Sequence, residues 1–140
     1  MKALSRVLGI ARMLSPWLLA GGLHAGEIPP RGCLAAIPPV IPEKQLMEQT
    51  RFGQHWSNPS LVAREHCVQI YPDQACFTLD QLEAALCKLP SSAWPYGRIV
   101  RLSPLSIGSR SAFASIDATF SATRSWLHAH GIRADLVPPA

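Results

Sequence analysis

Four cysteines constrain the fold of this 140-residue chain more than any other feature, because each pair that bonds ties two distant segments together. They are Cys33, Cys67, Cys76 and Cys87. Zinc sites and thiol redox centres usually contain two cysteines about two to four residues apart, and the shortest spacing here is nine. The spacing therefore predicts disulfides and no metal site, provided that the chain enters an oxidising compartment.

The N-terminus indicates which compartment that is. Three basic residues precede an apolar run from Met13 to Leu23, and small residues follow it. This is the layout of a secretory signal peptide with a cleavage site after Ala25, or after Gly22 as the alternative. We therefore expect residues 1–25 to be a signal peptide and the mature protein to be periplasmic or secreted.

An uncleaved membrane anchor is the rival interpretation of the same segment. A membrane-spanning helix needs about 20 mostly apolar residues, whereas Arg12 and Pro16 interrupt this one. The signal peptide is therefore preferred, and a membrane-anchored protein that faces the periplasm is the alternative. Only that alternative predicts a contact with the membrane.

The charge of the mature chain argues against a nucleic-acid partner. The whole chain has 13 Lys and Arg against 9 Asp and Glu, a net charge of +4. Cleavage of the signal peptide removes three basic residues and no acidic one, which leaves a net charge of +1. The remaining basic residues are scattered singly, whereas nucleic-acid binding requires a basic stripe or patch.

Prolines dominate the segment from Glu27 to Pro42. Proline fixes φ and lacks an amide hydrogen, so we expect an extended arm, which serves as a spacer or as a ligand for a proline-binding groove. A short helix over Glu43–Phe52 and a loop over Gly53–Arg64 follow. Residues 26–64 are therefore expected to form a proline-rich arm and loop ahead of the small domain, with the arm either lying on that domain or leading away from a membrane.

Residues 65–140 alternate between strand and helix patterns and are expected to form one small domain. Strands are expected over Cys67–Tyr71, Ala75–Thr78, Arg98–Ser103 and Ile132–Val137. A leucine stripe follows the helix cap Thr78 and ends at Pro90, and a second apolar stripe from Phe113 to Leu127 ends at Gly131. The order β-β-α-β-α-β predicts an α+β fold: a two-layer sandwich with two helices on one face of a small mixed sheet.

The predicted elements favour one disulfide pairing among the three that four cysteines allow. Cys67 and Cys76 flank the predicted hairpin turn, so they face each other across it. Cys87 lies on the flank of the first helix, where the arm that carries Cys33 can reach it. We therefore expect the bonds Cys67–Cys76 and Cys33–Cys87.

No combination of residues predicts catalysis. His128 and His130 would point to opposite sides of a helix, and their position in its last turn favours capping. Ser109 stands where a helix cap is expected, and no serine lies in a nucleophile motif. We therefore expect a protein that is not an enzyme and needs neither a cofactor nor a metal.

Two features indicate binding to another polypeptide. Trp56 and Trp94 lie in predicted loops, where aromatic side chains serve as binding anchors or as lids over a small core. The first and last strands of the predicted domain are candidate sheet edges, which can accept an extended partner segment. Val68 and Leu136 on those strands are therefore expected to bind the partner, together with the two tryptophans.

Residues 66–137 contain a strand pair that leads into the helix TLDQLEAAL, a short strand at GRIVRLS, and a longer helix that ends in HGIRADLV. This order resembles the periplasmic domain of the ExbD/TolR family of biopolymer-transport proteins. Members of that family carry an acidic residue in a transmembrane helix, and residues 4–23 here contain none. The cysteines are not a family feature either. The resemblance therefore implies a periplasmic binding domain without the motor function of the family.

These expectations combine into one function. We expect an exported, non-enzymatic binding or interaction module of the cell envelope, whose partner is an envelope protein and which could also form a homodimer. The alternative is an ExbD/TolR-like envelope transport component anchored by an uncleaved N-terminal helix.

Overall fold

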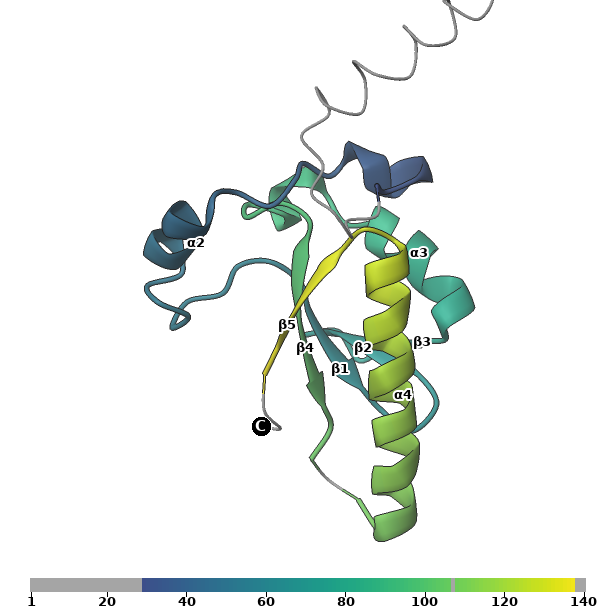
Figure 1. The fold of residues 1–140 in the computed structure, drawn as a ribbon. Coiled ribbons are helices and arrows are strands. Elements are labelled where there is room, and N and C mark those ends of the chain that lie inside the picture. The colour runs from purple at the N-terminus through teal and green to yellow at the C-terminus, as the bar shows by residue number, and fades with distance from the viewer. Residues whose placement is uncertain (1–28, 107, 138–140) are drawn as a thin grey trace, which may run out of the picture.

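A five-stranded mixed sheet forms the centre of the protein. The computed structural model describes residues 29–106 and 108–137, so the expected signal peptide lies outside the described residues. The strands lie in the order β3-β2-β1-β4-β5 (Figure 1). Their bounds are β1 Ser60–Ala63, β2 Val68–Tyr71, β3 Cys76–Phe77, β4 Ile99–Pro104 and β5 Arg133–Leu136. β1 is antiparallel to β2 and parallel to β4, β2 is antiparallel to β3, and β4 is parallel to β5.

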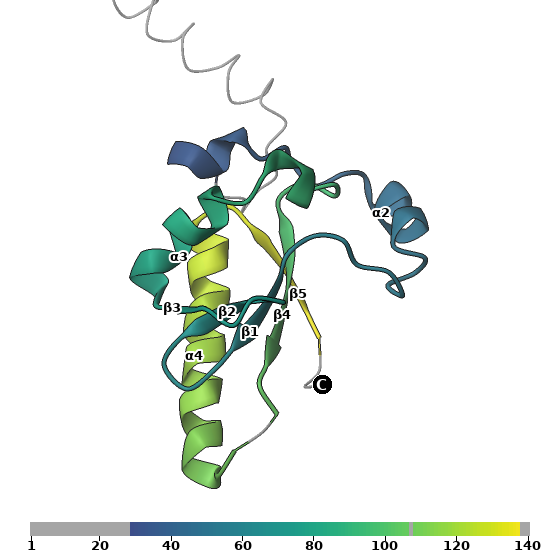
Figure 2. The ribbon, with the colours of Figure 1, turned by 180° about the vertical axis from the view of Figure 1, so that it is seen from behind.

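Two helices, α3 (Leu79–Cys87) and α4 (Arg110–Ala129), cover one face of this sheet (Figures 1 and 2). α4 contacts β1, β4 and β5, whereas α3 contacts β3 and the short 3-10 helix η1 (Gly32–Ala36). Alternate strand residues on this face pack against the helices. The core that results contains Leu61, Val68, Ile70, Val100 and Leu102 from the strands and Leu82, Leu86 and Leu127 from the helices. The predicted α+β sandwich is therefore confirmed.

α3 and α4 begin at the predicted caps, whereas α2 (Glu43–Gln49) and α3 (Leu79–Cys87) end about three residues earlier than predicted. The Oγ of Ser109 accepts a hydrogen bond from the N–H of Ala112 at 3.3 Å and caps α4. α3 begins with a capping box, in which the Oε1 of Gln81 accepts from the N–H of Thr78 at 3.1 Å. Gly131 follows α4 with a φ of 75°, a left-handed conformation that lets the chain turn directly into β5.

The proline-rich arm belongs to the folded domain, which corrects the expectation of a separate arm and loop over residues 26–64. Leu34 is fully buried and Ile37 is 8% exposed, and both side chains are part of the main core. Proline content alone predicted an extended arm but not that its apolar side chains would be buried. The folded unit therefore begins well before residue 65.

Backbone contacts also hold the arm on the domain. The N–H of Arg98 donates to the carbonyl oxygen of Pro38 at 2.9 Å, so the arm lies beside the segment that leads into β4. Gly97 permits this approach, because a Cβ at its position would lie 2.1 Å from the carbonyl oxygen of Pro39. A side chain at residue 97 would therefore push the arm off the sheet.

The middle strand of the sheet, β1, lies in a segment that was expected to be a loop. Leu61 and Ala63 are fully buried between the sheet and the helices. A strand of four residues is too short to show a clear alternation of apolar and polar side chains. A domain boundary at residues 64 and 65 would therefore separate the sheet from its central strand.

Asn58 explains how β1 is placed beside β4. Its side chain is buried, and its Nδ2 donates to the carbonyl oxygens of Gly97 and Ile99, both at 2.8 Å. Its Oδ1 accepts from the N–H of Tyr96 at 2.9 Å. Asn58 precedes a proline, which signals a turn in a sequence, but its amide serves here to hold two distant segments together.

Both predicted disulfides are confirmed. Cys67 and Cys76 close the β2–β3 hairpin with a Cα–Cα distance of 5.5 Å, and Cys33 joins η1 to Cys87 at the end of α3 with a distance of 6.0 Å. Among the described residues, no cysteine is free. One bond therefore closes the hairpin, and the other fastens the arm to α3.

The other face of the sheet is only partly covered. The short helix α2 (Glu43–Gln49) projects to that side, away from α4 (Figures 1 and 2), while η2 (Ser91–Ala93) leads toward β4. Leu46 from α2 packs with Tyr96 and Ile99 in a second, smaller cluster. No helix in residues 29–106 and 108–137 has the length and apolar character to cross a membrane.

Candidate functional site at strand β5

β5 forms one edge of the sheet, and its outer side is open. The N–H groups of Arg133 and Val137 donate to carbonyl oxygens of the neighbouring chain segment at 3.0 and 3.1 Å. Backbone polar groups alternate between the two sides of a strand, so Ala134 and Leu136 direct theirs away from β4. Within the part of the chain that the structure describes, no strand pairs with this outer side. The edge therefore has two positions at which another strand can hydrogen-bond.

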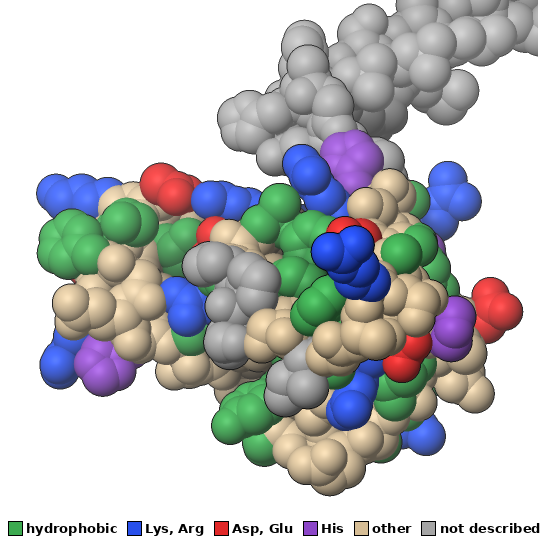
Figure 3. All heavy atoms as spheres, turned by 90° about the horizontal axis from the view of Figure 1, so that it is seen from below, with side chains coloured by type: hydrophobic (Ala, Val, Ile, Leu, Met, Phe, Trp, Pro, Cys, Tyr) green, Lys and Arg blue, Asp and Glu red, His purple; other side chains and the backbone are tan. Residues whose placement is uncertain are grey.

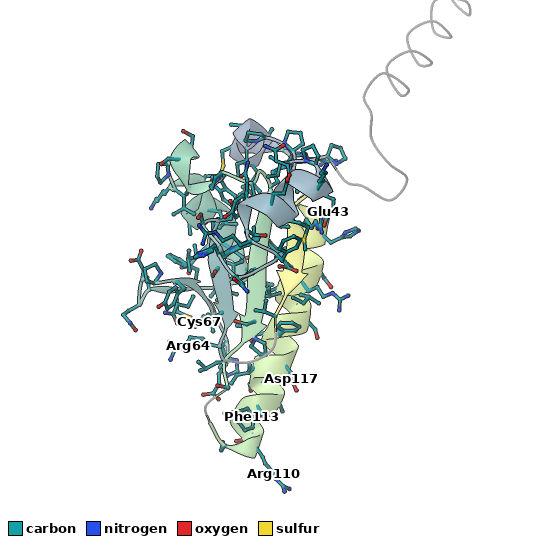
Figure 4. All side chains as sticks on the ribbon, turned by 90° about the vertical axis from the view of Figure 1, so that its left-hand side faces the viewer. Glu43, Arg64, Cys67, Arg110, Phe113 and Asp117 are labelled. Atoms are coloured by element: carbon teal, nitrogen blue, oxygen red, sulfur yellow. A yellow bond between two sulfur atoms is a disulfide. The ribbon has the colours of Figure 1, made fainter. Side chains whose placement is uncertain are left out.

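The helix-covered side of this edge carries exposed apolar side chains. Leu136 pairs in register with Leu102, so it lies on the face that packs against the helices, yet it is 41% exposed. Phe113, on the N-terminal half of α4, is 40% exposed (Figure 4). An added strand would find apolar surface on this side.

The opposite side of the edge carries charges. The Nη1 and Nη2 of Arg133 donate to the two carboxylate oxygens of Glu43 at 3.0 and 3.1 Å. The Oδ2 of Asp135 lies 3.7 Å from the Nε of Arg101 on β4. The hydrogen bond and charge of Arg133 lower the pKa of Glu43, and the same contact raises the pKa of Arg133. Acids and bases therefore alternate along this side of the edge.

A cleft of about 220 Å³ lies between α2 and the open sheet face beside β5. The guanidinium of Arg101 lies 4.6 Å from the centroid of the Trp56 ring, a cation–π contact. Its Nη2 also donates to the carbonyl oxygen of Gly53 at 2.6 Å. The buried Nε of Arg101 has no hydrogen-bond partner among the described atoms. Trp56 and Arg101 thus line one wall of the cleft, and the Nε–H of Arg101 is left without an acceptor among the described atoms.

The loop over this cleft has an unusual backbone. Arg51 and Phe52 have φ values of 49° and 57°, in the left-handed region that residues other than glycine rarely adopt. Phe52 lines the cleft and is 77% exposed. Strained backbone that holds an aromatic side chain in solvent is often found at binding sites.

The four residues that the sequence predicted for partner binding are separated by the fold. Leu136 lies on a true edge, and Trp56 lines the cleft beside that edge. Val68 was predicted to lie on an edge strand, and this is wrong: β2 lies between β1 and β3, and Val68 is 1% exposed. Trp94 is 4% exposed and belongs to the main core, which matches the lid interpretation.

Sequence reasoning missed the charged members of the site. Arg101, Arg133 and Asp135 interrupt apolar strand patterns, and a charge inside a short strand is a signal for an edge or an open face. That signal becomes useful only when the strand order is known, because it does not say which strands are neighbours.

Other chemistry-bearing residues stay apart from β5. In residues 29–106 and 108–137, no group of three or more His, Cys, Asp or Glu side chains is placed to hold a metal ion. His130 stacks on Trp126 with ring centroids 3.9 Å apart, and its Nδ1 lies 2.8 Å from the carbonyl oxygen of Trp126. This histidine therefore packs on the C-terminal end of α4 and contacts one of its last carbonyl oxygens.

Basic and acidic side chains are interspersed on the face of the molecule shown in Figure 3. Apolar side chains lie between them. This distribution agrees with the scattered basic residues of the sequence and differs from the continuous basic surface that nucleic acids require.

Comparison with known proteins gives no neighbour: no family model, no curated protein and no solved structure matches this chain. The resemblance to the ExbD/TolR periplasmic domain therefore stays a prediction. The function has to be argued from the site itself.

Proposed function

We propose that this protein is an exported, non-enzymatic interaction module of the cell envelope that takes up an extended segment of another polypeptide as an added strand on β5. The observation that carries the proposal is the open outer side of β5, where Ala134 and Leu136 direct backbone groups away from β4. Main-chain hydrogen bonds to an added strand satisfy such groups, and this is a common mode of peptide recognition.

The side chains around β5 support a selective contact. Leu136 and Phe113 offer apolar surface on one side of the edge, and Arg133 and Asp135 offer charges on the other. An added strand with alternating apolar and charged residues matches both sides at once, because its own side chains alternate in the same way.

The compartment is part of the proposal. Two disulfides fit an oxidising environment, and the signal-peptide pattern of residues 1–25 leads to the same place. We therefore propose the periplasm or the extracellular space as the location, with an envelope protein as the class of partner.

Two substitutions at Leu136 test the docking edge. Leu136→Pro removes an outward N–H and leaves the hydrogen bonds to β4 in place, whereas Leu136→Ala shortens the side chain and keeps the N–H. The tagged mature protein captures its partner from an envelope fraction, and circular dichroism establishes that each variant is folded. We expect the proline variant to lose the partner and the alanine variant to retain it. A folded proline variant that captures as well as the wild type would move the site to the cleft beside Trp56.

A further inference from the structure

We propose that the strand that pairs with β5 is the β5 of a second copy of this chain, antiparallel and centred on Ala134. The inference rests on the proposed function, since it uses the same edge and names the polypeptide that occupies it. It joins two five-stranded sheets into one continuous sheet, with α3 and α4 of both copies on the same side.

The backbone restricts the registers that such a pair can adopt. Within β5, only Ala134 and Leu136 direct hydrogen-bonding groups outward. In a two-fold antiparallel pair, each of these residues must therefore lie opposite Ala134 or Leu136 of the second copy. Three symmetric arrangements meet this condition, with the two-fold axis beside Ala134, Asp135 or Leu136. The side chains choose between them.

Charge favours the arrangement about Ala134. It places Arg133 directly opposite Asp135 of the second copy, and symmetry repeats this pair on the other side of the axis. An axis beside Asp135 places the two identical carboxylates opposite each other, where like charges are destabilising. An axis beside Leu136 leaves Asp135 opposite Val137, so the carboxylate gains no partner across the interface. β5 is thus complementary to itself in one register.

The neighbouring charges extend this complementarity. Arg133 already binds Glu43 through two hydrogen bonds, and Asp135 lies 3.7 Å from Arg101. In the arrangement about Ala134, each side of the axis therefore carries four charges that alternate in sign: Glu43 and Arg133 of one copy, then Asp135 and Arg101 of the other. Networks of this kind are worth more than isolated surface pairs.

The apolar side of the edge agrees with the same register. Ala134 forms a hydrogen-bonded pair with its own copy, and its small side chain places no steric obstacle at the two-fold axis. Leu136, which is 41% exposed, lies opposite Ile132 of the second copy and loses contact with water. β5 has four residues, so the interface is small compared with the total of about 1,200–2,000 Å² that stable complexes bury, and we expect a reversible dimer.

The test uses an acidic and a basic variant of the full mature, disulfide-bonded protein. Arg133→Glu gives an acidic β5 edge and Asp135→Arg gives a basic one. Sedimentation equilibrium over a range of protein concentrations measures self-association. We expect each variant alone to dimerise roughly tenfold more weakly than the wild type or worse, because like charges then face each other. Mixed together, the two variants should form a heterodimer, because acidic residues of one copy face basic residues of the other.

Controls separate this inference from the proposed function. Glu43→Gln removes the intramolecular partner of Arg133 and should still dimerise, and Leu136→Pro should not. Recovery of association in the mixture also shows that both charge variants are folded. A wild type that stays monomeric, or a mixture that does not associate, overturns the inference. If a different protein is then captured by the wild type and lost with Leu136→Pro, the proposed function survives without the dimer; if Leu136→Pro changes neither association nor capture, both fail.

Discussion

The two edges of the sheet are built in different ways. The β3 edge is two residues long, Cys76 in it is bonded to Cys67, and the chain passes almost directly into α3. The β5 edge has four residues, an open outer side, and a base and an acid on one face. A very short edge strand offers too few hydrogen bonds for any added strand to pair with it. A charged edge strand disfavours only those added strands whose charges do not complement its own. One edge is therefore closed and the other is selective.

Volume alone would have favoured the other edge. A groove of about 830 Å³ lies between the β2–β3 hairpin and α3, against about 220 Å³ for the cleft beside β5. Its wall includes apolar side chains such as Ile70, Phe77 and Leu89. An apolar wall of this kind accepts many occupants, while the alternating charges at β5 specify one pattern. The smaller site is therefore the more selective of the two for its partner.

The largest expected effect on stability is the difference between proline substitutions at two neighbouring positions of β5, Asp135 and Leu136. Asp135→Pro removes an N–H directed at β4 and leaves a ladder carbonyl without its donor, so the free energy of unfolding should fall by about 3 kcal/mol. Leu136→Pro removes an outward N–H and should cost less than about 1 kcal/mol. Urea denaturation at low protein concentration measures both losses. Equal losses would contradict the alternation on which the open edge depends.

A second prediction concerns removal of the disulfide at the β3 edge. Replacing Cys67 and Cys76 together by serine removes a bond between residues nine positions apart. Loop entropy predicts a loss of about 2.5 kcal/mol in the free energy of unfolding. Amide hydrogen exchange should show lower protection in β3 and at the start of β2, with β5 unchanged after correction for the global loss. Local loss of protection at β5 would mean that the two edges are coupled and that the comparison above is too simple.

The smallest effect concerns pH. The pKa of Glu43 is lowered from its ordinary value of 4.5, chiefly by its hydrogen bond to Arg133 and then by the charge of that residue. The folded pKa lies below the unfolded one, so the contact stabilises the fold above pH 4.5, and this contribution is lost as the pH falls from 4.5 through the folded pKa. The same contact raises the pKa of Arg133, so its charge does not change in this range.

Thermal unfolding between about pH 3 and 7 checks this linkage. Glu43→Gln should unfold at a slightly lower temperature than the wild type near neutral pH, and the difference should shrink toward acid pH. Glu48→Gln, on the same helix, serves as the matched control. A difference that grows as the pH falls would have the wrong sign and would remove Glu43 from the charge network at β5.

The sequence predicted the parts of the fold that depend on local patterns. The caps at Thr78 and Ser109, the stop at Gly131 and both disulfides needed only neighbouring residues or the positions of predicted elements. The strand that carries Leu136 was also correctly predicted to be an edge of the sheet.

The remaining parts depend on contacts between distant segments. β1 has only four residues, and its burial comes from a parallel partner strand 41 positions away in register, so no local pattern identified it. Once β1 was missed, β2 was taken for an edge, and Val68 was assigned to partner binding by the same error. The charge network at β5 was hidden for a related reason, since Glu43 and Arg133 are 90 residues apart.

The central position of β1 also determines when the protein can fold. The three backbone groups that the amide of Asn58 binds lie 38 to 41 residues later in the chain. A chain that is still emerging from a ribosome or a transport channel therefore holds β1 and β2 with one side unpaired until the segment near residue 96 arrives. Folding of the sheet therefore has to wait for this segment, as is usual for sheets with distant pairings. β5 is then among the last elements to be placed, so its selective edge is offered to a partner only when the rest of the domain is complete.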